Sequence, residues 1–330
     1  MNEPSAHAFW TVAPGQGEIR TEHLADLGQD MVRVETDFSA ISRGTESLVW
    51  NGAVPESQYH AMRAPFQAGN FPGPVKYGYG AVGGVVEGPA DLVGSRVFCL
   101  HPHQTLFQVP AESVAALPDD LPSERAVLAA NMETAVNACW DAAPVLGERI
   151  AVIGAGVVGC LVAHLMAQVP GTRVALVDVL EEKRAVAEAL GLDFRMPKEV
   201  RRAEAACDLV VHASGNPDGL DQALRLAGLE ARIIELSWYG DRSVALPLGE
   251  AFHSRRLRLI SSQVGHLPVH RQPRWSNRAR MALALDLLRD PVYDALITGE
   301  DRFEDLPRVM GRIAQDPTVL CHRLRYDGGR

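Results

Sequence analysis

The sequence predicts an α/β protein in which a β-rich N-terminal domain is followed by a doubly wound domain with a parallel sheet. Two observations support this prediction. Short apolar segments separated by Gly and Pro occupy the first hundred residues, as in a compact barrel or folded sheet. Between residues 150 and 260, strand patterns alternate with helix patterns, which is typical of a parallel sheet covered by helices on both faces.

The β-rich domain, expected over residues 1–122, contains several candidate strands. Residues 31–39 alternate between apolar and polar side chains, as a half-buried strand does. Residues 52–79 are rich in Pro, Gly and aromatic residues, and they predict a long ordered loop or an insertion of short helices. Shorter strands are expected at residues 82–87, 96–100 and 106–109.

The doubly wound domain is expected over residues 123–265, followed by a C-terminal segment over residues 266–330. Ser123 is a candidate N-cap for a helix that runs to about Trp140. Strands are then expected at residues 150–153, 173–178, 208–212, 231–236 and 257–260, with helices between them. The final segment combines helices at 277–289 and 303–314 with strands at 296–298 and 320–324, and we expect it to return to the N-terminal domain.

The stretch Ile150-Ala-Val-Ile-Gly-Ala-Gly-Val-Val-Gly159 carries the clearest functional signal. An apolar strand leads into Gly154, Gly156 and Gly159, the G-x-G-x-x-G spacing that binds a pyrophosphate at the start of a helix. The first glycine permits the tight turn and the second lets the backbone approach the phosphates. The third lets the helix and the strand pack closely.

A helix and an acidic residue follow the glycines in the expected order. Val157 and Val158 would open the helix, whose unpaired N–H groups favour an anion. The next strand ends in Asp178, 19 positions after the last glycine, close to the spacing of the acid that binds a ribose. This carboxylate would repel a 2′-phosphate, and Lys183 and Arg184 follow only about one helical turn later. The sequence therefore predicts a dinucleotide site that favours NAD(H) over NADP(H).

Composition disfavours several other classes of protein. The net charge of −9 argues against non-specific binding to nucleic acid or to anionic membranes. The start of the chain lacks the pattern of a signal peptide, and no run is long and apolar enough to cross a bilayer. The five cysteines are scattered without a C-x-x-C pair, which argues against disulfides and against a four-cysteine zinc site. We expect a cytoplasmic protein.

The order of these segments resembles the medium-chain dehydrogenase/reductase superfamily over nearly the whole chain. The motifs that carry the resemblance are Ile41-Ser-Arg-Gly-Thr-Glu46, Tyr77-Gly-Tyr-Gly-Ala-Val-Gly83, the glycine stretch, Ala189-Leu-Gly-Leu-Asp193 and His212-Ala-Ser-Gly215. The resemblance implies a GroES-like catalytic domain, a Rossmann domain, and hydride transfer between a nicotinamide and an alcohol or carbonyl. It also implies cofactor contacts for Thr134, Ser214 and Gly215. The Ser-x-Gly-Thr-Glu segment is similar to the bacteriochlorophyllide dehydrogenase-like branch.

Other residue types occupy the positions that hold catalytic zinc in such enzymes. By the resemblance, Arg43 replaces a metal-binding Cys, Tyr79 replaces a His, and Ala130 stands at the third ligand position. A shift of one helical turn would substitute Glu133, but a single carboxylate does not hold Zn²⁺. The cysteine-rich lobe that binds structural zinc is also missing. We therefore expect no zinc.

Without a metal, side chains have to stabilise and protonate the oxygen that gains negative charge during hydride transfer. By the resemblance, Thr45 stands where a hydroxyl relays the proton from the substrate oxygen. Arg43 could supply fixed positive charge, and Tyr79 could supply a phenolic donor. Alternatively, Arg43 binds a cofactor phosphate or Glu46, and Tyr79 only fills the space vacated by the metal.

His101 and His103 form a second candidate cluster. If this segment is extended, both imidazoles point to one face of a strand, where they could donate a proton or bind a metal. The alternative is a surface turn. Glu133 is either a supporting acid next to Thr134 or an ordinary helix residue. A zinc enzyme with rearranged ligands would have to use these two histidines and Glu133.

Three expectations concern partners and rival functions. Residues 257–262 with Gln263-Val-Gly265 resemble a segment that pairs across a dimer, so we expect a homodimer acting on a small molecule. The aromatic residues between Tyr59 and Tyr79 suit a large, flat or apolar substrate. The rival functions are reduction of an activated C=C bond in quinones or enones, and a nucleotide-binding sensor or assembly subunit without catalysis.

Overall fold

The computed structural model describes residues 4–200 and 206–327. The chain divides into two compact units. The first, which we call the β-rich unit, combines Met1–Ala130 with Met281–Arg330, and the second, the parallel-sheet unit, comprises Asn131–Arg280. These boundaries fall later in the chain than the expected 122 and 265.

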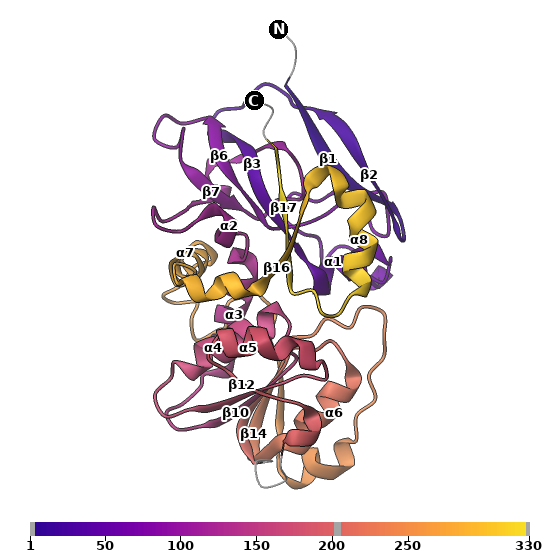
Figure 1. Ribbon diagram of the computed structural model, residues 1–330, viewed down its shortest axis with the longest axis vertical. Helices are drawn as coiled ribbons and strands as arrows, with labels where there is room; N and C mark the ends of the chain where they lie inside the picture. The colour runs from indigo at the N-terminus through magenta and orange to yellow at the C-terminus, as the bar shows by residue number, and fades with distance from the viewer. Residues whose placement is uncertain (1–3, 201–205, 328–330) are drawn as a thin grey trace. The chain divides into compact units, whose positions relative to one another are not determined.

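The largest sheet of the β-rich unit has seven strands, and β3 (Met31–Ser42) pairs with three of them. The others are β6 (Ala81–Glu87), β7 (Arg96–Cys99), β8 (Leu106–Pro110), β9 (Val114–Ala116), β16 (Ile297–Arg302) and β17 (Cys321–Arg325). Their order is β16-β17-β3-β6-β7-β9, with β8 also paired to β3. Val32 and Val34, at alternate positions of β3, are buried together with Phe107 in one core. Figure 1 shows the C-terminal strand β17 beside β3, with which it pairs antiparallel.

A second sheet of this unit contains strands that the sequence did not predict. It has the order β2-β1-β5-β4, formed by β1 (Ser5–Ala13), β2 (Gln16–His23), β4 (Ala68–Gly69) and β5 (Val75–Lys76). The buried positions Ala6 and Ala8 of β1 are small, so the hydrophobic alternation is weak. Gly15 in the turn between β1 and β2 has a φ of +74°, which suits glycine.

Helices of the β-rich unit cover these sheets. α1 (Arg43–Trp50) begins directly after β3, and α8 (Leu306–Gln315) packs with it. The core they share includes Phe9, Trp50 and Met310. Because α1 starts where β3 ends, the candidate residues at 43 and 45 are held at one end of the large sheet.

The single helix expected from Ser123 to about Trp140 is two helices, α2 (Ser123–Ala126) and α3 (Ala129–Ala142). The interruption contains two fully buried residues, Val127 and Leu128. Beside it, Arg125 forms a bidentate ion pair with Asp294 at 2.7 Å for both bonds. This long-range contact fixes the position of the short helix α2, and the local sequence gives no sign of it.

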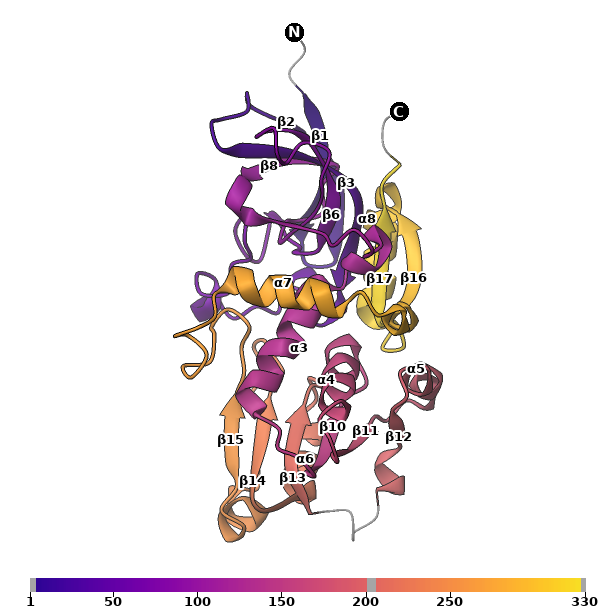
Figure 2. The ribbon, with the colours of Figure 1, turned by 90° about the vertical axis from the view of Figure 1, so that its left-hand side faces the viewer.

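The parallel-sheet unit contains a six-stranded sheet of order β12-β11-β10-β13-β14-β15, in which all neighbours are parallel. The strands are β10 (Arg149–Ile153), β11 (Arg173–Val177), β12 (Asp193–Arg195), β13 (Cys207–His212), β14 (Ala227–Glu235) and β15 (Arg258–Ser261). Helices α4 (Val157–Ala167), α5 (Arg184–Ala189) and α6 (Pro217–Leu226) connect them (Figure 2). This confirms the predicted doubly wound sheet. Its order reverses between β10 and β13, where such sheets bind ligands at the carboxyl ends of the strands.

The remaining described elements are one further helix and several short helical turns. They are α7 (Asn277–Leu287), η1 (Glu56–Gln58), η2 (Ala111–Ser113), η3 (Glu181–Lys183), η4 (Pro197–Glu199), η5 (Leu248–Phe252), η6 (Pro291–Leu296) and η7 (Phe303–Asp305). Residues 52–79 hold only η1, β4 and β5 among irregular backbone, in line with the long ordered loop that was predicted. Within residues 4–200 and 206–327, no helix has both the length and the apolar character needed to cross a membrane.

Candidate active site

The glycine motif forms the turn between β10 and α4. Gly154 has a φ of +106°, and a Cβ there would lie 2.7 Å from the backbone of Ser214. A Cβ on Gly159 would lie 1.8 Å from the carbonyl oxygen of Gly154, so only glycine fits at both positions. Gly156 has open space around it and is the N-cap of α4, which begins with Val157 and Val158. The turn therefore leaves room for a pyrophosphate beside the helix N-terminus.

Asp178 lies where β11 ends, and its carboxylate is oriented by three bonds. The backbone N–H of Ala155 donates to Oδ2 at 2.7 Å, and the N–H of Leu180 donates to Oδ1 at 3.0 Å. Lys183 Nζ also lies 3.0 Å from Oδ2, with both side chains only 8% exposed. The sequence placed Lys183 about a turn away from the acid, whereas the fold brings its charge directly onto it. Arg184 is instead bound by Glu181 and Glu199.

The three other predicted cofactor contacts of this unit lie on two different elements. Ser214 and Gly215 follow β13, so they share the carboxyl edge of the sheet with the glycine turn. Gly215 has a φ of +66°, and its N–H donates to Ser237 Oγ at 3.1 Å. Thr134 lies half-buried on α3.

In the β-rich unit, the first turn of α1 and Tyr79 bring several hydroxyl groups together. The Tyr79 hydroxyl hydrogen bonds with the side chains of Ser42 and Thr45. Burial and, to a lesser extent, the nearby Glu46 carboxylate raise the pKa of Tyr79 to about 12, and the hydrogen bonds with Ser42 and Thr45 limit the rise. The phenol is therefore protonated at neutral pH and can act as a donor. Thr45 and Tyr79, separated by more than thirty positions, form one cluster.

A buried chain of hydrogen bonds begins beside this cluster. Nε2 of His103 lies 2.9 Å from Oε2 of Glu46, whose Oε1 accepts the backbone N–H of Ser42 at 2.8 Å. On its other side, Nδ1 of His103 lies 2.8 Å from Ser39 Oγ, which lies 2.9 Å from the hydroxyl of Tyr326. All but Ser42 are less than a tenth exposed. Sequence reasoning did not find Ser39 or Tyr326, because their partners lie far away along the chain.

The structure shows the surroundings of the other charged candidates of this unit. Glu46 pairs with His103. Arg43 contributes to a lowered pKa of Asp316, after the hydrogen bonds from Thr318. His101 and His103 do not share a strand face, since neither belongs to a strand. His101 is stacked on Phe107, with ring centroids 4.0 Å apart, and burial lowers its pKa to about 3.

Glu133 has a structural partner within the parallel-sheet unit. It accepts a bond from Arg280 Nε at 3.1 Å, and the two side chains are 7% and 3% exposed. The same guanidinium donates to the carbonyl of Val264 at 2.6 Å and to the side chain of Asn137 at 2.5 Å. Burial raises the pKa of Glu133, and Arg280 opposes that rise. These bonds favour the ordinary helix residue over the supporting acid.

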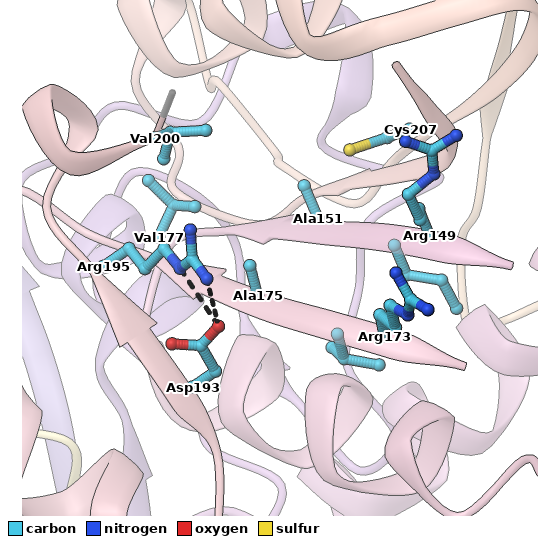
Figure 3. Close-up of a pocket in the computed structure, with 11 residues that line it drawn as sticks. Arg149, Ala151, Arg173, Ala175, Val177, Asp193, Arg195, Val200 and Cys207 are labelled. Atoms are coloured by element: carbon cyan, nitrogen blue, oxygen red, sulfur yellow. Dashed lines mark hydrogen bonds and ion pairs between the residues drawn. The ribbon is translucent and has the colours of Figure 1, made fainter. Parts of the chain in front are cut away.

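A cavity of about 590 Å³ lies along one face of the parallel sheet. Figure 3 shows Arg149 and Arg173 at one end, and at the other Arg195, which forms an ion pair with Asp193 at 2.8 Å. Its floor comes from apolar residues of β10 and β11. Neither the three motif glycines nor Asp178 lines it, so this cavity is separate from the dinucleotide site.

Comparisons with known proteins place this geometry in context. No protein-family model matches the chain. An uncharacterized zinc-type alcohol dehydrogenase-like protein of Haemophilus influenzae is 26% identical over 226 residues, covering 65% of this chain and 61% of that protein. D-guloside 3-dehydrogenase of Escherichia coli is 22% identical over 324 residues, covering 91% of this chain and 90% of that enzyme. The match to the Haemophilus protein thus spans less than two thirds of its length.

Solved structures cover nearly the whole chain. An alcohol dehydrogenase of E. coli CFT073 in complex with NADH matches with a TM-score of 0.77 at 17% identity, over 98% of this chain and 100% of that one. A dehydrogenase of Sinorhizobium meliloti 1021 bound to NADP matches with a TM-score of 0.78 at 18% identity, over the same shares. The fold is that of the medium-chain alcohol dehydrogenases. The curated relatives thus include a zinc-type alcohol dehydrogenase-like protein and dehydrogenases of sugars or polyols.

The residues that correspond to the zinc ligands of medium-chain alcohol dehydrogenases do not fit this metal. A guanidinium at Arg43, a protonated phenol at Tyr79 and a methyl group at Ala130 offer no set of three ligands. Glu46 and His103 are bonded to each other. Within residues 4–200 and 206–327, no group of three or more His, Cys, Asp and Glu side chains is arranged to hold a metal.

The residues of the glycine turn and Asp178, in contrast, fit a nicotinamide dinucleotide. The open space at Gly156 admits a pyrophosphate, and the Asp178 carboxylate retains a lone pair on Oδ1 for a ribose hydroxyl. Gly154, Gly156, Val157, Val158 and Gly159 would hold the phosphates, and Ser214 and Gly215 would contact the cofactor at the same sheet edge.

Proposed function

We propose that this protein is an NAD(H)-dependent oxidoreductase that interconverts an alcohol and a carbonyl without zinc. One observation carries the proposal: the hydroxyls of Tyr79, Ser42 and Thr45 meet beside the buried Glu46–His103 pair. Such a cluster supplies hydrogen-bond donors to a substrate oxygen at the location where related enzymes use a metal. The dehydrogenase relatives support the same reaction class.

The chemistry follows from which groups hold protons. When bound, the nicotinamide supplies or accepts the hydride. Tyr79 keeps its proton at neutral pH, so it can donate to the substrate oxygen and stabilise the negative charge that develops there. Thr45 shares a hydrogen bond with Tyr79 and can pass the proton between the substrate and the phenol. In carbonyl reduction the proton that Tyr79 donates stays on the product alcohol, and a proton from solvent then restores the phenol, because Glu46 makes the phenolate unfavourable. In alcohol oxidation these steps run in reverse, and one proton is released to solvent.

The preference for NAD(H) rests on the carboxylate of Asp178. A 2′-phosphate on the ribose would face this buried acid at close range. Lys183 partly offsets the repulsion, but its ammonium is already bound to Asp178. The next cation along the chain, Arg184, is occupied by two glutamates. We therefore propose that NAD(H) binds more tightly than NADP(H).

We propose a secondary hydroxyl of a polyol or glycoside as the substrate group. Matched relatives of this chain are D-guloside, sorbitol and galactitol 1-phosphate dehydrogenases. In the β-rich unit, a series of aromatic rings leads to Tyr79: Tyr59 contacts Phe71, Phe71 contacts Tyr77, and Tyr77 contacts Tyr79, at centroid distances of 5.7, 5.7 and 6.1 Å. Such rings can stack on the C–H face of a sugar as well as on a flat apolar body.

We also propose an oligomeric state, a cellular compartment and a branch of the superfamily for this protein. β15 is an edge strand with Leu259 39% exposed, which suits pairing with a second copy in a homodimer. All five cysteines are free, as is usual in the cytoplasm. Because the segment from Ser42 to Glu46 resembles the bacteriochlorophyllide dehydrogenase-like branch, we also propose that the protein belongs to this branch.

The proposal is tested by steady-state assays with purified protein. Polyols and glycosides are offered with NAD⁺ or NADP⁺, and ketones and enones are offered with NADH, while bound metal is measured by plasma mass spectrometry. We expect alcohol oxidation with substoichiometric zinc. Tyr79→Phe should lower kcat by about a hundredfold, whereas the control Tyr293→Phe, in η6 and outside the proposed site, should not change it.

Four other outcomes contradict the proposal. Turnover of enones but not of ketones or alcohols indicates a C=C reductase. One tightly bound zinc per subunit indicates a metal enzyme. Tight NADH binding without turnover, or turnover unchanged by both Tyr79→Phe and Thr45→Val, refutes the assigned chemistry.

A further inference from the structure

A second hydrogen-bonded group of side chains lies in the parallel-sheet unit. One member, Ser214, is also a proposed cofactor contact, but the proposed hydride transfer uses neither the histidine nor the carboxylate of this group. It consists of His212 at the end of β13, Ser214 two residues later, and Glu235 at the end of the neighbouring strand β14. The parallel register pairs His212 directly with Glu235. The fold therefore places a hydroxyl, an imidazole and a carboxylate in a row at the carboxyl edge of the sheet.

The distances define a continuous relay. Ser214 Oγ lies 2.6 Å from Nε2 of His212. Nδ1 of the same ring lies 2.9 and 2.8 Å from the two oxygens of Glu235. The imidazole is fully buried, and the Glu235 side chain is 13% exposed. These are the contacts that a serine nucleophile requires: a base within reach of the hydroxyl, and a third group that orients the base.

The relay also fixes which nitrogen carries the proton. A carboxylate only accepts hydrogen bonds, so Nδ1 of His212 donates to Glu235, and Nε2 accepts from the Ser214 hydroxyl whenever it carries no proton. Two further donors hold Glu235 in place, the backbone N–H of Ser237 at 2.7 Å and the hydroxyl of Tyr239 at 3.2 Å. His212 is therefore set as a base toward Ser214.

Ser214 itself is accessible, unlike the base behind it. The residue is exposed and lies in the turn that joins β13 to α6. Its Oγ accepts the backbone N–H of Asn216 at 3.2 Å, which leaves one lone pair free for attack. The first turn of α4 packs against the preceding residue, since a Cβ on Gly159 would lie 3.7 Å from the Cβ of Ala213. Amide groups of that turn have no intrahelical acceptor and can donate to an oxyanion.

We propose that Ser214 is an activated nucleophile that accepts an acyl group from small activated esters. Ser214 Oγ forms a bond to the ester carbonyl carbon while His212 Nε2 takes its proton. The bond from carbon to the leaving alkoxide then breaks, and the alkoxide leaves as the alcohol with the proton from His212. Water repeats the sequence on the acyl-serine and releases the acid, with no change in oxidation state.

This activity is independent of the proposed dehydrogenase reaction, because it needs neither a nicotinamide nor the cluster around Tyr79. The first test uses wild-type protein without nicotinamide and a fluorophosphonate probe, which transfers its phosphonyl group to an activated serine and releases fluoride. The labelled position is identified by peptide mass spectrometry. Hydrolysis of p-nitrophenyl acetate is followed in parallel.

We expect the label on Ser214 and its complete loss in Ser214→Ala. Glu235→Gln and His212→Gln should slow labelling and ester hydrolysis by about a hundredfold or more. Ser254→Ala is the matched control, since Ser254 is exposed in the same unit and is not bonded to a histidine, and it should label at the wild-type rate. Thermal unfolding of each variant shows whether it is folded.

Two results overturn the proposal. One is wild-type protein that takes up no label at Ser214. The other is labelling of folded Glu235→Gln at the wild-type rate, which means that Ser214 reacts without the relay. The first result is obtained with the wild-type protein. The proposal can therefore be refuted even if His212→Gln does not fold.

Discussion

Nε2 of His103 lies 2.9 Å from Oε2 of Glu46, and the two side chains are 1% and 6% exposed. This pair lies next to Tyr79, where the Glu46 carboxylate contributes to the raised pKa of the phenol. Removing one partner would leave a buried polar group without its bond, which costs more than removing both together. The pair therefore links the stability of the β-rich unit to the chemistry proposed for it.

A double-mutant cycle measures this link. We expect Glu46→Gln and His103→Gln each to lower the free energy of unfolding by about 2 kcal/mol, and the double variant to cost less than their sum by about 1 kcal/mol or more. Urea denaturation of the four proteins provides the values. Additive costs would mean that the two side chains do not act as a unit.

The glycines at 156 and 159 should separate stability from cofactor binding. A Cβ on Gly159 would clash with a backbone oxygen at 1.8 Å, so Gly159→Ala should destabilise the protein by about 2 kcal/mol or more and abolish NADH binding. A Cβ on Gly156 meets no protein atom within 4 Å, so Gly156→Ala should fold normally. It should nevertheless weaken NADH binding, because the methyl group projects where the pyrophosphate approaches.

Thermal unfolding and fluorescence titration with NADH check both variants. If Gly156→Ala binds NADH like the wild type, the pyrophosphate does not approach this glycine.

Asp178 should control the choice between NADH and NADPH. Asp178→Asn keeps an acceptor for the N–H of Ala155 but removes the charge that opposes a 2′-phosphate. We expect the ratio of the two dissociation constants to shift toward NADPH by about tenfold, or ~1.4 kcal/mol. Asp193→Asn, which alters an exposed acid bound to Arg195, is the control and should leave the ratio unchanged. An equal ratio in wild type and Asp178→Asn would remove this residue from cofactor selection.

His101 should make the protein less stable in mild acid. Burial lowers its pKa from the usual 6.5 to about 3, so below pH 6.5 the unfolded chain binds a proton that the folded protein does not. The stabilisation is therefore present above pH 6.5 and is lost as the pH falls toward 3. Between pH 7.5 and 5.0 this residue should remove about 2 kcal/mol.

His101→Phe keeps an aromatic ring on Phe107 and removes the titrating group. The loss of stability between pH 7.5 and 5.0, measured by urea denaturation, should be smaller in this variant by about the same 2 kcal/mol. Identical pH dependence in the two proteins would show that protonation of His101 does not contribute to acid unfolding.

Local sequence was sufficient to predict the features that depend only on residues close together in the chain. The strand, glycine turn, helix and acid from Ile150 to Asp178 form one continuous unit, and the positive φ of Gly154 is a property of that single residue. The alternation in β3 likewise predicted its buried valines. These features can be predicted because the spacing of apolar residues and the backbone freedom of glycine are properties of a few neighbouring residues.

Tertiary structure alone decided which distant side chains meet. Glu46 and His103 are far apart in sequence, and they meet because the loop at His103 folds beside α1. Ser39 and Tyr326 are still farther apart, and they meet because β17 joins the sheet at β3. The same holds for Glu133, which the fold assigned to Arg280, and for His212 and Glu235, aligned by the register of two parallel strands. A side chain's type limits the bonds it can make, but strand order and register determine its partner, and no local pattern encodes them.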